Sequence, residues 1–222
     1  MDMAGPLLGA GIQTRLLPAI LEETRPNSLG AVAYHGRRSV YRKGKTMAND
    51  YLLVIDMQND FVDGALGTPE AAAIAGDVAA YARDFAGTVV FTRDTHGEDY
   101  LRTQEGTNLP VTHCVAGTPG WELAPAVAEV RRALDAPVFD KPTFGSAELA
   151  SWLVARDAER PITSIELCGL CTDICVVSNA LLLKAFLPEV PVRVRAALCA
   201  GVTPASHEAA LSTMRSCQVE VL

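Results

Sequence analysis

The sequence predicts an α/β fold built on a parallel sheet of about six strands. Short apolar runs, typical of buried strands, alternate with segments of helical periodicity from residue 51 to the end of the chain. Aromatic residues make up only 6% of the 222 residues, whereas alanine, valine and leucine are abundant, which favours alternating strands and helices over an all-β sandwich. Strands joined through helices run parallel with right-handed crossovers, so their carboxyl ends meet at one edge of the sheet.

The first strand is expected at "YLLVID", residues 51–56, and the first helix at 69–84, where Pro69 follows Thr68. Proline is favoured at the first helical position, because its missing N–H needs no partner there. A second strand at 87–94 leads into a long polar loop at 95–120. The later helices are expected at 121–134, 146–155 with Ser146 as N-cap, 172–186 and 205–216. The later strands are expected at 137–141, 164–170, 190–198 and 217–222.

The expected helix at 172–186 is apolar on nearly all sides. A helix of this kind is buried on several faces, as it would be inside the domain or at a subunit interface. We therefore expect it to pack closely against neighbouring elements.

Residues 1–46 differ in composition from the remainder of the chain. They carry seven of the 19 Lys and Arg residues but only three of the 26 Asp and Glu residues. The stretch "RPNSLGAVAYHGRRSVYRKGK" shows neither helical nor strand periodicity. An Arg-rich, acid-poor segment suits a targeting arm, but the break falls directly before Met47 and a clean strand. This position favours a disordered or non-native upstream extension, followed by one domain at residues 47–222.

The formal net charge of −7 argues against a nucleic-acid-binding surface. No apolar run approaches the ~20 residues that span a bilayer, and the sequence shows no signal-peptide pattern. The six cysteines lie mostly in apolar contexts and are expected to be reduced thiols. These observations favour a cytoplasmic protein without nucleic-acid or membrane partners.

Three of the cysteines, Cys168, Cys171 and Cys175, fall within eight positions. Their C-x-x-C-x-x-x-C spacing is similar to that of zinc or iron–sulfur ligands. However, a strand, a turn and a helix would have to bring the three sulfurs together, and no fourth ligand is evident. A disulfide is disfavoured in a reducing compartment. Two interpretations of Cys175 remain, a nucleophilic thiol and an inert buried cysteine. The spacing alone does not decide between them.

The helix that contains Cys175 favours the nucleophile. Thr172 or Asp173 is expected to cap this helix and to leave its first N–H groups free. Such groups stabilise a thiolate and bind the oxyanion that forms when a thiolate attacks a carbonyl. Asp56 and Lys141, at the ends of the first and third strands, are candidates for the base and for a cation that stabilises the thiolate. Considered singly, Asp56 is equally consistent with a residue that caps a loop, and Lys141 with a solvated surface lysine.

The polar loop after the second strand holds a potential set of metal ligands. Asp94 and His96 are two residues apart at the strand end, and Glu105 and His113 follow along the loop. Two imidazoles and two carboxylates suit zinc, iron or manganese better than magnesium or calcium. A long loop inside a compact domain is usually functional, although polar loops also contain such residues by chance.

Five segments together resemble the isochorismatase-like cysteine hydrolases over residues 50–222. They are "VIDMQNDF", "FTRDTH", "HCVAGTPGWEL", "DKPTFGS" and "GLCTDICV", in the order typical of that family. The resemblance implies a Rossmann-like parallel sheet with helices on both faces, in a protein that is usually oligomeric. It also implies a catalytic triad of Asp56, Lys141 and Cys175. The backbone N–H groups of Cys171 and Cys175 are then expected to form an oxyanion hole, next to a cis peptide at Leu170–Cys171.

Within that family, the chain is similar to the nicotinamidases, which add a metal. The resemblance implies that the metal is held by Asp94, His96, Glu105 and His113. The expected metal is zinc, with iron or manganese as alternatives, and it is expected to bind the pyridine nitrogen and orient the substrate. Phe61 is expected to form one wall for the substrate ring, and Trp121 a further substrate contact.

Two departures from the nicotinamidases leave the substrate open. Residues 109–112 lack the aromatic residue that often precedes the last histidine ligand, and Trp121 stands where a small residue is common. The expected activity is metal-assisted hydrolysis of nicotinamide or a similar aromatic amide to the acid and ammonia, through a thioester.

Two alternatives to that activity remain. They are another amidase of the family, acting on carbamoyl or ureido compounds, and a non-catalytic metal-binding scaffold. A vinyl-ether hydrolase of the isochorismate type is disfavoured, because such enzymes generally need no cysteine nucleophile. The expected partners are a small-molecule amide and further copies of the chain in a homo-oligomer.

Overall fold

The computed structural model describes residues 48–222, and the expectation for residues 1–46 lies outside the described residues. The described residues form one six-stranded sheet in the order β3-β2-β1-β4-β5-β6, and every neighbouring pair of strands is parallel. The strands are β1 Asp50–Ile55, β2 Thr88–Asp94, β3 Val138–Lys141, β4 Ser164–Leu170, β5 Val192–Ala200 and β6 Glu220–Val221. The predicted parallel sheet of about six strands is confirmed.

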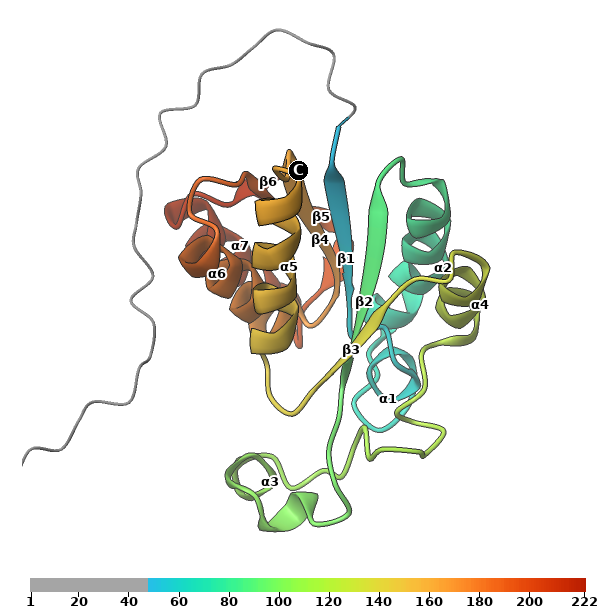
Figure 1. The fold of residues 1–222 in the computed structure, drawn as a ribbon. Helices are drawn as coiled ribbons and strands as arrows, with labels where there is room; N and C mark the ends of the chain where they lie inside the picture. The colour runs from blue at the N-terminus through green and yellow to red at the C-terminus, as the bar shows by residue number, and fades with distance from the viewer. Residues whose placement is uncertain (1–47) are drawn as a thin grey trace, which may run out of the picture. The chain divides into compact units, whose positions relative to one another are not determined.

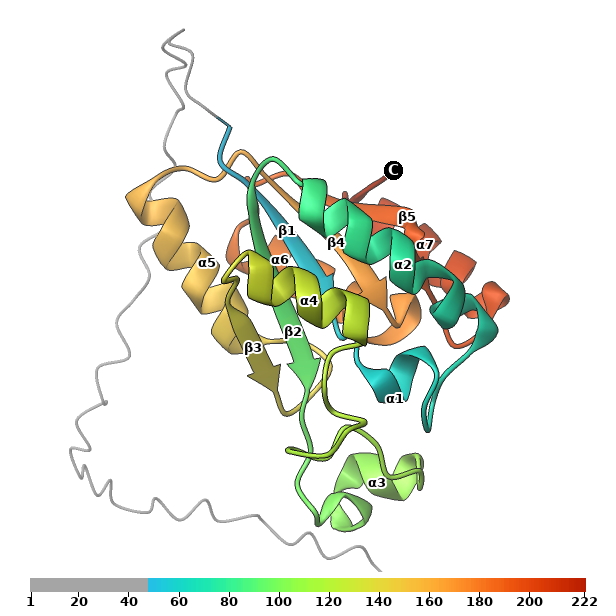
Figure 2. The ribbon, with the colours of Figure 1, turned by 90° about the vertical axis from the view of Figure 1, so that its right-hand side faces the viewer.

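Helices cover both faces of the sheet, with α2 and α4 on one side and α5, α6 and α7 on the other (Figure 1 and Figure 2). The longer helices are α2 Pro69–Asp84, α4 Pro125–Ala133, α5 Ala147–Glu159, α6 Val177–Phe186 and α7 Pro204–Ser216. The shorter ones are α1 Asn59–Val62, a 3-10 turn Tyr100–Arg102, α3 Gln104–Asn108 and a π-helical turn Thr172–Val176. Within residues 48–222, none of the helices combines the length and apolarity that a membrane crossing needs.

The central strands β1 and β4 form the core of the sheet. Every residue of β4 is buried, as are all residues of β1 except the first. A strand covered by helices on both faces has no polar side, which explains the continuous apolar run at residues 52–55. Gly169 of β4 has a φ of +112°, and its backbone lies so close to the carbonyl group of Ile55 that no side chain fits between them.

Side-chain caps determine where three helices begin. The hydroxyl of Thr68 accepts a hydrogen bond from the Ala71 N–H at the start of α2, and that of Ser146 accepts one from the Leu149 N–H at the start of α5. Thr203 forms a capping box at the start of α7. These starts lie within one residue of the predicted positions.

Three predicted elements are shorter than expected. The helix expected at 172–186 is α-helical only from Val177, because residues 172–176 form the π-helical turn. The helix expected at 121–134 begins only at Pro125, because the residues before it bond to the segment after β1. Gln58 and Leu123 form an antiparallel bridge, and the Ala124 N–H donates to the carbonyl of Met57 at 2.8 Å. The strand expected at 217–222 covers only Glu220–Val221.

Candidate active site

The carboxyl ends of three adjacent strands bring Asp56, Asp94 and Lys141 together. Asp56 directly follows β1, while Asp94 ends β2 and pairs in register with Lys141 at the end of β3. Their exposed fractions are 0%, 3% and 1%, so three charged groups are shielded from solvent in one place. Asp56 also has a φ of +47°, a left-handed backbone that is uncommon outside glycine and is concentrated at functional sites.

Lys141 lies between Asp56 and Cys175. Its Nζ is 2.7 Å from Asp56 Oδ2 and 3.4 Å from Cys175 Sγ. Asp56 Oδ1 accepts a hydrogen bond from Thr92 Oγ1 at 2.7 Å. Lys141 therefore contacts both of the other residues of the expected triad.

Burial and the neighbouring charges determine the protonation states of this triad. Burial raises the pKa of Cys175 well above its ordinary value, so the resting group is a neutral thiol. Burial also raises the pKa of Asp56, which the positive charge of Lys141 only partly opposes. For Lys141, burial favours the neutral form, but the neighbouring acidic groups, Asp56 first among them, together outweigh it and raise the pKa of the ammonium. A neutral thiol thus faces an unusually basic carboxylate and a fixed cation, which suits proton transfer from sulfur to oxygen.

Cys175 lies in the π-helical turn Thr172–Val176, which leads from β4 into α6. The peptide bond between Leu170 and Cys171, just before this turn, is cis, as the family resemblance implied. The expected side-chain cap is wrong, because neither Thr172 nor Asp173 caps the turn and its N-cap residue is Cys171.

The polar side chains of the turn bond instead to the segment around the start of α7. Thr172 Oγ1 pairs with His207 Nδ1 at 2.8 Å, and Asp173 Oδ1 accepts a hydrogen bond from the Val202 N–H at 3.0 Å. These two bonds fix the nucleophile turn from outside.

Asn179 fixes the same turn from inside. Its side chain is 1% exposed and donates to the carbonyl oxygens of Cys175 at 2.8 Å and Phe144 at 3.1 Å. It also accepts a hydrogen bond from the Ser146 N–H at 3.0 Å. The sequence reasoning missed Asn179, although a single asparagine in a mostly apolar helix is a signal that points to it.

Four side chains from the end of β2 and the following loop converge beside Lys141. The ligand atoms of Asp94, His96, Glu105 and His113 all lie within 4.8 Å of one another. Asp94 Oδ2 is 2.9 Å from His96 Nε2 and 3.5 Å from His113 Nε2. Glu105 Oε1 is 3.6 Å and 3.9 Å from the same two nitrogens. The structure therefore gathers all four residues that were expected to be metal ligands.

The donor atoms of this group fit a divalent transition metal. His113 Nδ1 lies 2.8 Å from the carbonyl oxygen of Val111, and because a carbonyl only accepts, Nδ1 carries the proton and Nε2 keeps its lone pair. His96 Nε2 is buried without a hydrogen-bond partner, although the Asp94 carboxylate lies 2.9 Å away. Two imidazole nitrogens and two carboxylates that meet at one point suit zinc.

Tyr100, which the sequence reasoning missed, positions both imidazoles. Its ring is fully buried and lies 4.6 Å from the ring of His96 and 4.9 Å from that of His113, measured between centroids. Its hydroxyl donates to the carbonyl of Leu109 at 2.9 Å. A buried tyrosine thus holds the polar loop closed around the four donors.

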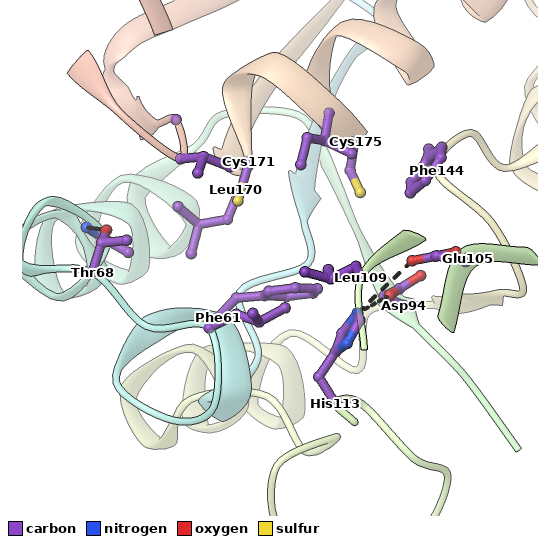
Figure 3. Close-up of a pocket in the computed structure, with 15 residues that line it drawn as sticks. Phe61, Thr68, Asp94, Glu105, Leu109, His113, Phe144, Leu170, Cys171 and Cys175 are labelled. Atoms are coloured by element: carbon purple, nitrogen blue, oxygen red, sulfur yellow. Dashed lines mark hydrogen bonds and ion pairs between the residues drawn. The ribbon is translucent and has the colours of Figure 1, made fainter. Parts of the chain in front are cut away.

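A cavity of about 230 Å³ separates the thiol from the metal-ligand group (Figure 3). Asp94, Glu105 and His113 line one end, and Cys175 faces them across the cavity. Phe61 lines the cavity, where the sequence predicted a ring wall. The volume is below the roughly 300–1,000 Å³ of typical ligand pockets, which restricts the ligand to a small molecule.

Trp121 is not among the residues that line this cavity. Its indole N–H donates to Thr95 Oγ1 at 2.8 Å, and the guanidinium of Arg93 lies 3.5 Å from the centre of its ring. These two contacts hold the ring beside β2, away from the substrate position that was expected for it.

Gln58 is a further residue that the sequence reasoning missed. Its side chain is fully buried and bonds to both backbone groups of Asp94, accepting from the N–H at 2.7 Å and donating to the carbonyl at 2.9 Å. Its position in the "DMQNDF" segment directly after β1 is the signal that points to it.

Comparison of this sequence and fold with known proteins identifies the enzyme family. The family model described as "Isochorismatase domain" matches residues 50–222. The chain therefore belongs to the isochorismatase family, and it is a hydrolase whose named relatives include nicotinamidases and pyrazinamidases.

The names of individual relatives state a more specific activity than the family model does. The nicotinamidase/pyrazinamidase of Mycobacterium tuberculosis is 31% identical over 189 residues, which cover 77% of this chain and 97% of that protein. The structure of the pyrazinamidase of Pyrococcus horikoshii in complex with zinc has a TM-score of 0.66 at 29% identity and covers 78% of this chain and 98% of its own. The structure of the nicotinamidase of Bacillus subtilis has a TM-score of 0.67 at 30% identity, with the same coverage.

Proposed function

We propose that this chain is a metal-assisted cysteine amidohydrolase that converts nicotinamide or a similar aromatic amide into the carboxylic acid and ammonia. The observation that carries the proposal is the contact of Lys141 with both Asp56 and Cys175, in a site whose cavity ends at a group of metal donors. The names of the relatives, nicotinamidase and pyrazinamidase, support this substrate class.

The first half of the reaction forms a thioester. Asp56 accepts the proton of the Cys175 thiol, and the Lys141 ammonium, 3.4 Å from the sulfur, stabilises the thiolate. The thiolate attacks the amide carbon, and the resulting oxyanion accepts hydrogen bonds from the backbone N–H groups of Cys171 and Cys175. Asp56 then gives its proton to the amide nitrogen, the C–N bond breaks and ammonia leaves.

The second half of the reaction hydrolyses the thioester. Asp56, again ionised, takes a proton from water as the water oxygen attacks the thioester carbon. The C–S bond breaks, the acid is released and the proton returns to the sulfur. Lys141 stays protonated throughout, because the acidic groups around it together raise its pKa, so it supplies charge rather than a proton.

The metal in this proposal is a divalent cation held by Asp94, His96, Glu105 and His113. Zinc is the first choice, and iron and manganese are the alternatives. When bound, the cation supplies a Lewis acid for the lone pair of a nitrogen in the substrate ring. The ring of Phe61 lies 5.5 Å from that of His113, between centroids, and offers an apolar face to an aromatic substrate beside the metal donors.

The lining of the cavity favours a neutral aromatic amide over an anionic carbamoyl or ureido acid. Of the described residues that line it, none is Lys or Arg, and most are apolar. An acid whose carboxylate lies away from the metal donors would lack a counter-charge there, and burying an unpaired charge is costly. The carbamoyl alternative is therefore the weaker one.

Two further features belong to the proposal. All six cysteines are unpaired, which supports a reducing, cytoplasmic compartment. The family resemblance supports a homo-oligomer.

The experiment that tests the proposed function is an ammonia-release assay on nicotinamide, pyrazinamide and a panel of carbamoyl and ureido compounds. We expect turnover of the two aromatic amides, loss of that turnover in Cys175→Ala and its retention in Cys217→Ala, because Cys217 is exposed and remote from the site. Turnover that is insensitive to a chelator would contradict the metal's role. Absence of turnover on every amide would favour the non-catalytic scaffold.

A further inference from the structure

The cavity continues past the thiol on the side opposite the metal donors. In Figure 3, Thr68, Leu170 and Cys171 lie at one end, Asp94 and Glu105 at the other, and Cys175 between them. We call the end away from the metal donors the apolar lobe. Thr68, Leu170 and Cys171 lie at this end in Figure 3. Ala71, whose N–H donates to Thr68 Oγ1, lines the cavity as well, as do Leu66 and Val202.

The apolar lobe contains no charged side chain that could pair with a substrate group. The oxygen of Thr68, its one hydroxyl, already accepts a hydrogen bond from the Ala71 N–H at 3.0 Å. Burial raises the pKa of Cys171 to about 12, so its thiol stays neutral at physiological pH. Val202 is 53% exposed and opens the lobe to solvent at its rim. An alkyl group fits this chemistry, and a charged group does not.

We propose that the enzyme also hydrolyses secondary amides, and that the alkyl group on the amide nitrogen occupies the apolar lobe. The inference rests on the proposed function, because it takes the aromatic ring to lie toward the metal donors. A secondary amide is planar and trans, so its ring and its N-alkyl group point in opposite directions from the C–N bond. With the ring at the metal end and the carbonyl at Cys175, the alkyl group is directed into the apolar lobe. A primary amide leaves the lobe empty.

The chemistry of this reaction balances without any additional reagent. The bond from the Cys175 sulfur to the carbonyl carbon forms and the C–N bond breaks, and Asp56 delivers the former thiol proton to nitrogen. An alkylamine leaves in place of ammonia. Water then hydrolyses the same thioester to the same acid.

The test compares nicotinamide with its N-methyl, N-ethyl and N-propyl derivatives in the zinc-loaded enzyme, by following release of nicotinic acid. Because each buried methylene adds favourable burial, we expect kcat/KM to rise about fourfold per carbon from methyl to propyl. The N-carboxymethyl derivative is expected to react more slowly than the N-ethyl derivative, because the apolar lobe holds no cation. If kcat/KM stayed flat or fell from methyl to propyl while nicotinamide was still turned over, the assignment of the apolar lobe would be wrong and the proposed function would stand. No turnover of nicotinamide would refute the proposed function itself.

Substitutions in the apolar lobe provide the structural control. Ala71→Leu fills the lobe and should lower the ratio of kcat/KM for N-propylnicotinamide to that for nicotinamide by at least about tenfold. Ala72→Leu, on the exposed side of the same helix, should leave this ratio unchanged. Val202→Asp, at the exposed rim, is a second variant that introduces no bulk into the core, and it should lower the same ratio. An unchanged ratio in both folded lobe variants would contradict the assignment.

Discussion

The Nζ of Lys141 lies 2.7 Å from Asp56 Oδ2, and neither side chain reaches solvent. A buried ion pair of this kind is costly to break, because removing one partner leaves the other as an unpaired charge. Stability and catalysis therefore both depend on this ion pair. Single and double substitutions of its residues can separate the effect on stability from the effect on activity.

Lys141→Met should lower the free energy of unfolding by about 3–5 kcal/mol and abolish turnover, because Asp56 is left buried without its cation. The double variant Asp56→Asn with Lys141→Met should regain most of the stability but none of the activity. Denaturant unfolding and ammonia release measure the two effects, with Lys184→Met near the surface as the control. If Lys141→Met were as stable as the wild type, the proposed contribution of the ion pair to stability would be wrong.

The pH dependence of kcat/KM should report the raised pKa of Asp56. Asp56 must be ionised to accept the thiol proton, so activity falls as the pH drops through its pKa. Because burial raises this pKa above the ordinary value of about 3.9, the acidic limb should lie at higher pH than that. Circular dichroism over the same range separates this limb from acid unfolding, and Asp84→Asn, at the end of α2, should leave it unchanged. A limb at or below about pH 4 would show that Asp56 is not the base.

Glu105→Gln should weaken zinc binding by at least about tenfold, because it removes a carboxylate from the four donors. Titration calorimetry of the metal-free protein measures the affinity without reference to activity. The matched control is Glu98→Gln, an exposed position in the same loop, which should bind zinc as the wild type does. Equal affinity in both variants would remove Glu105 from the ligand set.

Gly169→Ala should destabilise the protein by more than about 1 kcal/mol, because φ at this position is +112° and a Cβ would meet the carbonyl group of Ile55. Relief of that contact requires β4 to move from β1, so activity should fall as well. Gly76→Ala in α2 is the matched control, since a Cβ there meets nothing within 4 Å. It should stabilise the helix by about 0.5–1 kcal/mol. Thermal unfolding of the two variants gives the comparison, and equal stability would contradict the close strand approach.

The strand periodicity was sufficient to predict which charged residues meet. Asp56, Asp94 and Lys141 each stand at the end of an apolar run, and parallel strands must end at one edge of the sheet. Asp94 and His96 stand at such a strand end, whereas the complete set of donors, with Glu105 and His113 from the loop that follows, was implied by the family resemblance.

Contacts between loops could not be predicted in this way. Trp121 was expected at the substrate, but its direction depends on Thr95 and Arg93, which are far from it in the sequence. The cap expected from Thr172 failed because His207, 35 residues later, takes its hydroxyl. Buried polar partners of this kind follow no periodicity, since each is determined by the packing of two distant segments.

The Cys175 sulfur is expected to carry the acyl group during turnover. Acid quenching of the enzyme during turnover of nicotinamide, followed by peptide mass spectrometry, detects such a group. We expect a nicotinoyl adduct on the peptide that contains Cys175, and neither adduct nor turnover in Cys175→Ala. Undiminished ammonia release by Cys175→Ala, or an adduct on another residue, would contradict it.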